Sequence, residues 1–303
     1  MEKMKCNICP RECGADRENG QLGVCGASNK IFIARAALHM WEEPCISGEE
    51  GSGAVFFTGC PLGCVYCQNY EISRGNSKKC EGTIGKRGTE VSVRELASIF
   101  IRLQDEKANN INLVTPTHYS YQIIEAITIA RANGLTIPIV YNCSGYEKKE
   151  TLEALAGYVD VYLTDFKYMD ERLAASYSKA ADYAEVVKVA LDEMVKQCGK
   201  PVFDDRGIMR KGVIVRNLLL PGNVKNSKEV ADYVYNKYGN MVYLSIMNQY
   251  TPLKQVENMP PLNRKVTKRE YNRLVDYVLS IGAENVFIQE GDVAKESFIP
   301  DFE

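Results

Sequence analysis

The stretch of sequence that decides the fold of this chain is Gly59-Cys60-Pro61-Leu62-Gly63-Cys64-Val65-Tyr66-Cys67-Gln68-Asn69. It follows directly on a short apolar run, residues 55–58, which has the composition of a buried β-strand. The loop therefore leaves the carboxyl end of a strand, where barrels of repeated strand–helix units carry their chemistry. Three cysteines spaced C-x3-C-x2-C on such a loop bring three thiolates into one small region.

The rest of the chain repeats a strand–helix pattern. Apolar runs predict strands at residues 55–58, 111–114, 137–141, 159–164, 213–220 and 242–246, with a further candidate at 285–288. Amphipathic segments predict helices at 93–107, 121–132, 148–156, 171–178, 183–197, 227–238 and 267–280. Ser92 and Glu95 have the spacing of a capping box. The pattern predicts an α/β fold, a partial parallel (β/α)6 barrel over residues 51–303.

Residues 1–50 are rich in Gly, Cys and Pro and show little periodicity, which predicts a separate, loop-rich head. Within it, Cys6, Cys9, Cys13 and Cys25 supply four thiolates, the number that suits tetrahedral zinc or a further iron–sulfur cluster. A metal is the favoured interpretation. A redox pair and buried free cysteines are the alternatives.

The composition excludes several classes of protein. Of 303 residues, 45% are hydrophobic and 25% are charged, as in a soluble globular protein. The net charge of -2 does not indicate a nucleic-acid partner. No apolar stretch approaches the ~20 residues that span a bilayer, and the N-terminus lacks an apolar signal core, so a cytoplasmic protein is expected. Eleven cysteines in that compartment indicate metal binding or catalysis rather than disulfides, and two histidines exclude a histidine-rich metal site.

The cysteine loop resembles the signature of the radical S-adenosylmethionine superfamily, with the usual aromatic residue, Tyr66, before the last cysteine. The flanking segments Phe57-Thr58-Gly59-Cys60 and Cys67-Gln68-Asn69-Tyr70-Glu71-Ile72-Ser73 resemble the branch related to pyruvate formate-lyase activating enzymes. The resemblance covers most of the chain, including the head. It implies a [4Fe–4S] cluster on Cys60, Cys64 and Cys67, with one iron open to S-adenosylmethionine. Inert cysteines or a zinc site are the alternatives, although structural zinc normally takes four protein ligands.

The resemblance also implies cofactor-binding residues after the next two strands. Thr115 and Thr117 stand where the superfamily often has Gly-Gly-Glu, so only their backbone and hydroxyl groups are carried over to the methionine amino group. Asn142 and Ser144 lie in a segment that resembles Asp-Thr-Asn-Gly-Phe, which holds a monovalent cation in the activating enzymes. Asn142 replaces the aspartate there, and a plain polar turn is the alternative at both places. The full set to which the resemblance gives a cofactor-binding role is Tyr66, Gln68, Thr115, Thr117, Asn142, Ser144, Lys167 and Arg216.

Two charged residues end the fourth predicted strand. Alternate residues share one face of a strand, so Asp165 and Lys167 can both point into the barrel. Opposite charges there are costly unless they are paired or functional. The segment resembles the Asp-Leu-Lys of the activating enzymes, which implies that Lys167 contacts the methionine carboxylate and that Asp165 lines the cation or ribose region. A structural ion pair is the alternative, and Arg216 on the fifth strand either contacts the cofactor or closes a barrel end.

Two further segments are candidates for the site wall. His118 is the only histidine in the predicted barrel, so it is either a proton donor or an exposed or satisfied side chain. Met247, Asn248 and Gln249 follow the sixth strand and would form the last wall, near adenine or substrate.

The resemblance implies reductive cleavage of S-adenosylmethionine to a 5′-deoxyadenosyl radical that abstracts hydrogen. The leading expectation is that this hydrogen comes from a glycine in a partner protein, which would make the chain a glycyl-radical-activating enzyme. The alternatives are a radical enzyme that modifies a small molecule or peptide, and a non-catalytic iron–sulfur electron carrier. The implied partners are an electron donor such as flavodoxin or ferredoxin and a glycyl radical enzyme.

Overall fold

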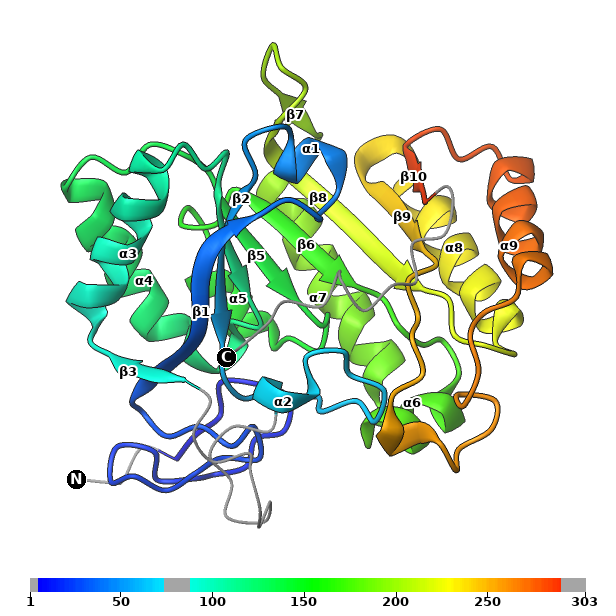
Figure 1. The fold of residues 1–303 in the computed structure, drawn as a ribbon, viewed down its shortest axis with the longest axis horizontal. Coiled ribbons are helices and arrows are strands. Elements are labelled where there is room, and N and C mark those ends of the chain that lie inside the picture. Colours follow the sequence, from blue (N-terminus) through cyan, green and yellow to red (C-terminus); the bar gives the residue numbers. More distant parts are fainter. Residues whose placement is uncertain (1–4, 74–87, 290–303) are drawn as a thin grey trace.

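The computed structural model describes residues 5–73 and 88–289 and shows one curved, mostly parallel sheet with helices on its outer face (Figure 1). The strand order is β10-β9-β8-β6-β5-β4-β2-β1-β3, and β7 pairs with β8 off this path. All pairs from β2 to β10 along the path are parallel. The parallel strands are β2 (Ser52–Phe57), β4 (Ile111–Val114), β5 (Ile139–Cys143), β6 (Val161–Asp165), β8 (Met209–Leu218), β9 (Tyr243–Met247) and β10 (Val286–Ile288).

The six predicted strands and the further candidate at 285–288 are confirmed, each within a few residues. In the described residues the parallel path has one strand more than the six strand–helix units predicted, because β10 extends it. In the part of the chain that the structure describes, β3 and β10 lie at opposite ends of the strand order and do not pair. The barrel is therefore open at one side.

The helices follow the amphipathic segments. The longer ones are α3 (Val93–Asp105), α4 (Ser120–Ala132), α5 (Lys149–Ala154), α6 (Glu171–Ser178), α7 (Tyr183–Cys198), α8 (Val224–Tyr238) and α9 (Lys268–Ser280), and short turns form α1 (Pro44–Ser47), α2 (Tyr70–Ser73), η2 (Thr117–Tyr119), η3 (Gly239–Met241) and η4 (Lys254–Val256). The capping box at Ser92 and Glu95 is present, because the Ser92 side chain accepts from the Glu95 backbone and the Glu95 carboxylate accepts from the Ser92 backbone. The buried face of α3, with Leu96, Phe100 and Leu103 fully covered, packs toward the sheet and joins its apolar core. No helix in the described residues is long and apolar enough to cross a membrane.

The first strand was not predicted. β1 (Ile31–His39) pairs antiparallel with β2, and β3 (Thr89–Val91) pairs antiparallel with β1. The boundary predicted at residue 50 therefore falls inside a β-hairpin, and β1 belongs to the barrel sheet. Its sequence, IFIARAALH, alternates apolar and polar residues only weakly, which is why periodicity did not reveal it. The short strand β7 (Val202–Phe203) was missed for a related reason, since two residues carry no period.

The loops before β1 lie against the end of the sheet that carries the cysteine loop (Figure 1). Arg11 joins the loops before β1 to the cysteine loop and to α6. Its Nε donates to the carbonyl of Pro61 at 2.9 Å, and its Nη2 donates to the carbonyl of Ser178 at 2.8 Å. A further guanidinium nitrogen donates to the carbonyl of Lys179. One side chain therefore holds both the cysteine loop and the last carbonyls of α6.

We expect Arg11→Ala to lower the free energy of unfolding by about 2 kcal/mol, because hydrogen bonds from a charged donor to several buried or half-buried carbonyls are lost together. Chemical denaturation followed by circular dichroism measures the change. The matched control is Arg206→Ala, whose guanidinium is 54% exposed and pairs with Glu50 and Asp204 at the surface. The control is expected to shift stability by less than ~0.5 kcal/mol. Equal effects of the two substitutions would show that Arg11 makes no special contribution.

Candidate active site

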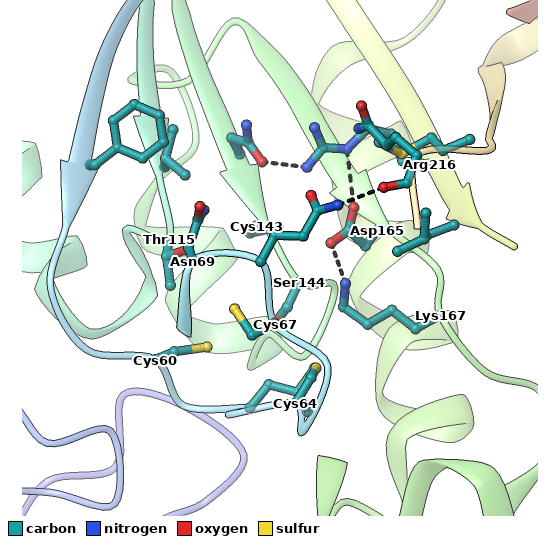
Figure 2. Close-up of a pocket in the computed structure, with 18 of the residues that line it drawn as sticks. Cys60, Cys64, Cys67, Asn69, Thr115, Cys143, Ser144, Asp165, Lys167 and Arg216 are labelled. Atoms are coloured by element: carbon teal, nitrogen blue, oxygen red, sulfur yellow. Dashed lines mark hydrogen bonds and ion pairs between the residues drawn. The ribbon is translucent and has the colours of Figure 1, made fainter. Parts of the chain in front are cut away.

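A pocket of about 1180 Å³, counted with its open mouth, lies inside the curve of the sheet, where the parallel strands end (Figure 2). Its walls combine the cysteine loop with residues from β4, β5, β6, β8 and β9. Residues of the cysteine loop, the strand ends and the segment after β1 line it: His39, Trp41, Glu42, Phe56, Cys60, Leu62, Cys64, Tyr66, Cys67, Gln68, Asn69, Val114, Thr115, Asn142, Cys143, Ser144, Asp165, Lys167, Arg216, Leu218, Met247 and Gln249.

The cysteine loop is held in place by backbone hydrogen bonds from outside it. The Cys60 N–H donates to the Cys25 carbonyl of the head at 3.1 Å, and the Val65 N–H donates to the Tyr177 carbonyl of α6 at 2.8 Å. Gly59 begins the loop with φ +89°, and a Cβ there would lie 2.7 Å from the Cys25 carbonyl oxygen. Only glycine allows both this conformation and this approach. The loop sequence thus folds against the head.

The three cysteines lie on this one loop at one end of the pocket (Figure 2). Burial raises the pKa of Cys60 to about 12 and that of Cys67 to about 11. Without further cations beside them, the Cys60 and Cys67 thiols would stay protonated at neutral pH. A set of iron ions offsets that penalty, so the donor set fits an iron–sulfur cluster.

In the described residues, no three His, Cys, Asp or Glu side chains converge as ligands of one metal ion. This finding is compatible with a cubane on the loop, because each thiolate of a cubane binds a different iron. It does not support the predicted zinc site of the head, where four sulfurs would have to meet at one point. Cys13 and Cys25 do approach each other, since a Cβ on Gly23 would lie 3.3 Å from both sulfurs. A metal in the head stays a prediction.

A network of buried charges crosses the pocket wall (Figure 2). Lys167 Nζ lies 2.6 Å from Asp165 Oδ2, and Arg216 Nε lies 3.0 Å from Asp165 Oδ1. Arg216 also donates to Glu42 Oε2 at 3.2 Å and to Asn142 Oδ1 at 2.6 Å. Burial opposes ionisation of Asp165, yet the charges of Lys167 and Arg216 lower its pKa below the usual value. Burial likewise works against the charge of Lys167, and Asp165 outweighs it and raises the pKa of Lys167.

This network shows how the two charges at the end of β6 are paired, with Asp165 as the last residue of the strand and Lys167 two positions after it. Asp165 and Lys167 form an ion pair, and both also line the pocket. Arg216 has Nε, Nη1 and Nη2 engaged with Asp165, Glu42 and Asn142. Arg216 therefore organises the wall, whereas Lys167 lies nearer the cysteine loop and its charge acts on Cys64 and Cys67.

Most of the predicted cofactor-binding residues line the pocket: Tyr66, Gln68, Thr115, Asn142, Ser144, Lys167 and Arg216. Thr115 has φ +58°, a left-handed conformation that is unusual for threonine and is most often found at functional sites. The Ser144 hydroxyl is buried without a hydrogen-bond partner among the described residues. A buried, unpaired hydroxyl in a pocket wall fits a ligand that supplies the missing partner. Asn142, in contrast, already binds Arg216 and Glu42 through its amide.

Thr117 and His118 lie outside the pocket. The Thr117 hydroxyl is buried and donates to Glu147 Oε1 at 2.8 Å, so it faces the loop between β5 and α5. His118 is buried, with its Nε2 2.8 Å from the Thr58 carbonyl, and burial lowers its pKa to about 3. A neutral, enclosed imidazole does not act as a proton donor at neutral pH. His118 is therefore enclosed rather than exposed, and only its Nε2 is satisfied, because its Nδ1 is buried without a hydrogen-bond partner among the described residues.

Three pocket residues come from the end of β1 and the segment after it, which the sequence had placed in the head. Glu42 accepts from Asn112 at 2.9 Å as well as from Arg216, and His39 and Trp41 also line the pocket. The adjoining Glu43 is buried, and burial raises its pKa. In the sequence, the signal that this segment belongs to the site is its pair of consecutive glutamates, Glu42 and Glu43. The pair directly precedes the buried helical turn α1.

Comparison with known proteins finds a family model and two relatives of similar sequence. The model of the radical SAM superfamily matches residues 54–204. The uncharacterized protein MJ0674 of Methanocaldococcus jannaschii is 28% identical over 89% of this chain and 73% of its own length. The uncharacterized protein MJ0808 of the same organism is 25% identical over 86% of this chain and 74% of its own length.

Two solved structures of Streptococcus suis SuiB show a partial similarity of fold. The form bound to S-adenosylmethionine has a TM-score of 0.49 and 15% identity, over 77% of this chain and 48% of that protein. The form bound to the precursor peptide SuiA has a TM-score of 0.47 and 15% identity, over 75% and 46% respectively. The chain thus spans about half the length of these structures.

Lys167→Met is expected to weaken S-adenosylmethionine binding by about 10- to 100-fold, because it removes a charged donor beside the cysteine loop. Thermal stability should change little, since Arg216 still neutralises Asp165. Anaerobic titration calorimetry and a melting curve on the same preparation measure the two effects. Lys188→Met, a lysine that pairs with Glu185 on α7, is the control. Normal affinity with a lowered melting temperature would identify Lys167 as a structural ion-pair partner only.

Glu147 gives a pH-dependent prediction. Burial raises its pKa from 4.5 to about 8 in the folded chain. Between those two pH values the folded state keeps a proton that the unfolded state releases, so stability falls as the pH rises from 4.5 to about 8. Glu147→Gln removes this dependence and should raise the melting temperature at pH 8.5 but not at pH 5. The exposed Glu153→Gln on α5 serves as the control, and a pH-independent effect of Glu147→Gln would contradict the assignment.

Proposed function

Because the chain belongs to the radical S-adenosylmethionine superfamily, we propose that it cleaves S-adenosylmethionine reductively and uses the product radical to abstract hydrogen from a second molecule. The observation that carries the proposal is the set of three thiols on one loop, beside a buried lysine, in an open pocket at the strand ends. A structural metal site would be closed by a fourth protein ligand. A loop with three thiolates leaves one iron of a [4Fe–4S] cluster for a substrate.

The residues of this chain have distinct tasks in that reaction. Cys60, Cys64 and Cys67 would hold the cluster, which when bound supplies the electron that splits the sulfonium into methionine and a 5′-deoxyadenosyl radical. Lys167 offers its ammonium to the methionine carboxylate while Asp165 keeps it charged and oriented. The unpaired Ser144 hydroxyl provides a further polar contact. The apolar wall of Phe56, Val114 and Leu218 keeps water from the radical.

For the hydrogen donor, we favour a glycine in a partner protein, as in glycyl-radical-activating enzymes. The resemblance of the cysteine loop to that branch is the first support. The second is Trp41, which lines the pocket and is 60% exposed, so that it gives the rim an apolar surface that an extended polypeptide can contact. Modification of a peptide fits the same rim and is the alternative, together with a small-molecule substrate.

The electron would come from a low-potential protein such as flavodoxin or ferredoxin. A non-catalytic electron carrier remains the third hypothesis, and it differs from both enzymes in one respect. A carrier has no use for a charged lysine and an unpaired hydroxyl in a pocket next to its cluster.

The test is anaerobic reconstitution with iron and sulfide, followed by dithionite and S-adenosylmethionine, with 5′-deoxyadenosine measured by chromatography. The wild-type chain should form 5′-deoxyadenosine. Alanine at Cys60, Cys64 or Cys67 should abolish it without unfolding the barrel, because these residues lie on a loop. The matched control is Cys198→Ala, a buried cysteine at the end of α7, remote from the pocket lining. Wild-type rates in any loop variant would refute the proposal.

A peptide that carries glycine deuterated at Cα distinguishes the hydrogen donors. Deuterium found in 5′-deoxyadenosine supports a glycine as the donor. If S-adenosylmethionine is cleaved without deuterium transfer, the proposed radical chemistry still holds, but the glycine of this probe is not the hydrogen donor.

A further inference from the structure

The sulfur of Cys64 receives a hydrogen bond from a buried side chain outside the cysteine loop. Ser178, the last residue of α6, has its Oγ 3.0 Å from Cys64 Sγ. Ser178 is fully buried and Cys64 is 7% exposed, so bulk water does not compete for this contact. The sulfur of Cys60, by comparison, lies near the backbone N–H of Gly63 at 3.5 Å. Of these two contacts, only the one to Cys64 can be removed by substituting a side chain.

The contact at Ser178 is the end of a chain of hydroxyl groups. Tyr168 OH lies 2.8 Å from Ser178 Oγ, and Tyr66 OH lies 2.6 Å from Tyr168 OH. A phenol hydroxyl is protonated at neutral pH, so both tyrosines are able to donate. Three hydroxyl groups in series thus link two residues of the cysteine loop, Tyr66 and Cys64.

If Cys64 binds a metal, the direction of every hydrogen bond in this series of hydroxyl groups is fixed. A thiolate has no proton and can only accept, so Ser178 must donate to Cys64. The Ser178 oxygen then accepts from Tyr168, and the Tyr168 oxygen accepts from Tyr66. Hydrogen bonds aligned in one direction polarise one another, which strengthens the last of them.

Ser178 is also held from the other side. Its carbonyl accepts from Arg11 Nη2 at 2.8 Å, and the neighbouring Tyr177 carbonyl accepts from the Val65 N–H. The end of α6 is therefore fixed to the head and to the cysteine loop at once. These bonds hold the backbone of Ser178 beside Cys64.

We propose that Ser178 is a positioning residue that sets the reduction potential of the cluster through its hydrogen bond to Cys64, with Tyr168 and Tyr66 polarising that bond. The inference rests on the proposed function, because it requires a cluster on the loop. One-electron reduction adds negative charge to the cluster and its thiolates, and no proton is transferred. A hydrogen bond to a thiolate stabilises the more negative, reduced state and so raises the potential. Ser178 thereby makes the cluster easier to reduce.

The experiment is a potentiometric titration of the reconstituted full chain with dithionite, in the absence of S-adenosylmethionine, followed by electron paramagnetic resonance of the reduced cluster. Ser178→Ala should lower the reduced-to-oxidised ratio at a fixed potential by about three- to tenfold, tenfold being about 59 mV for one electron. Tyr168→Phe, which keeps its packing, should shift the ratio in the same direction by less. Ser178→Thr, which keeps the hydroxyl, should remain near the wild type.

The control is Tyr162→Phe. Tyr162 is fully buried, and its hydroxyl donates to Gln197 Oε1 at 2.7 Å, away from the pocket. It tests whether loss of any buried phenol hydroxyl disturbs the cluster. Tyr162→Phe and Tyr168→Phe should lower thermal stability alike, whereas only Tyr168→Phe should move the potential. An equal shift in potential in the control would overturn the proposal.

The remaining outcomes are also decisive. An unchanged potential in Ser178→Ala with normal cluster content would overturn the role of Ser178 and leave the proposed function standing. If Ser178→Ala loses the cluster, Tyr168→Phe decides, because an unchanged potential in that variant then overturns the proposal. Failure of the wild-type chain to bind a cluster contradicts the proposed function itself, so the two failures are distinguishable.

Discussion

The position of one loop, residues 60–67, constrains much of this structure. The loop has to present three thiols on one side with no fourth ligand to fix them, so its backbone is held from outside. Cys25 of the head accepts from Cys60, Tyr177 of α6 accepts from Val65, and Arg11 binds the Pro61 carbonyl. Loss of ligand geometry in such a loop would misplace every group that faces it. The head is thus part of the site's support, in addition to any metal it binds.

The charges inside the barrel solve a second physical problem. A lysine aimed at an anionic ligand must stay charged while buried, and burial alone would lower its pKa. Asp165 prevents this at 2.6 Å, and Arg216 in turn keeps Asp165 ionised. Glu42 and Asn142 complete the network and satisfy the guanidinium. The arrangement leaves Lys167 as the member of the network that acts on the cysteine loop.

Much of the fold could be predicted because its signals are local. The strand runs, the helical stripe of α3 and the capping box at Ser92 each depend on residues a few positions apart. The same holds for the thiols of the cysteine loop and for the spacing of Asp165, the last residue of β6, and Lys167, two positions after it. Predictions failed where the local signal was weak or ambiguous. β1 alternates poorly, and Thr117 and His118 lie in a turn whose direction no period specifies, so that Thr117 faces Glu147 instead of the pocket.

The sequence by itself determined the cysteine loop after a strand, the order of the parallel strands and of the longer helices, and with them the superfamily. Only the tertiary structure decided which distant residues complete the site. Arg216 meets Glu42 across 174 positions, Arg11 meets Ser178 across 167, and Ser178 meets Cys64 across 114. Such pairs depend on the path of the whole chain around an open barrel, and no spacing within a loop encodes that path. The residues that carry the local chemistry are neighbours in the sequence. The contacts that adjust this chemistry form only when the sheet has curved and α6 has packed against the loop.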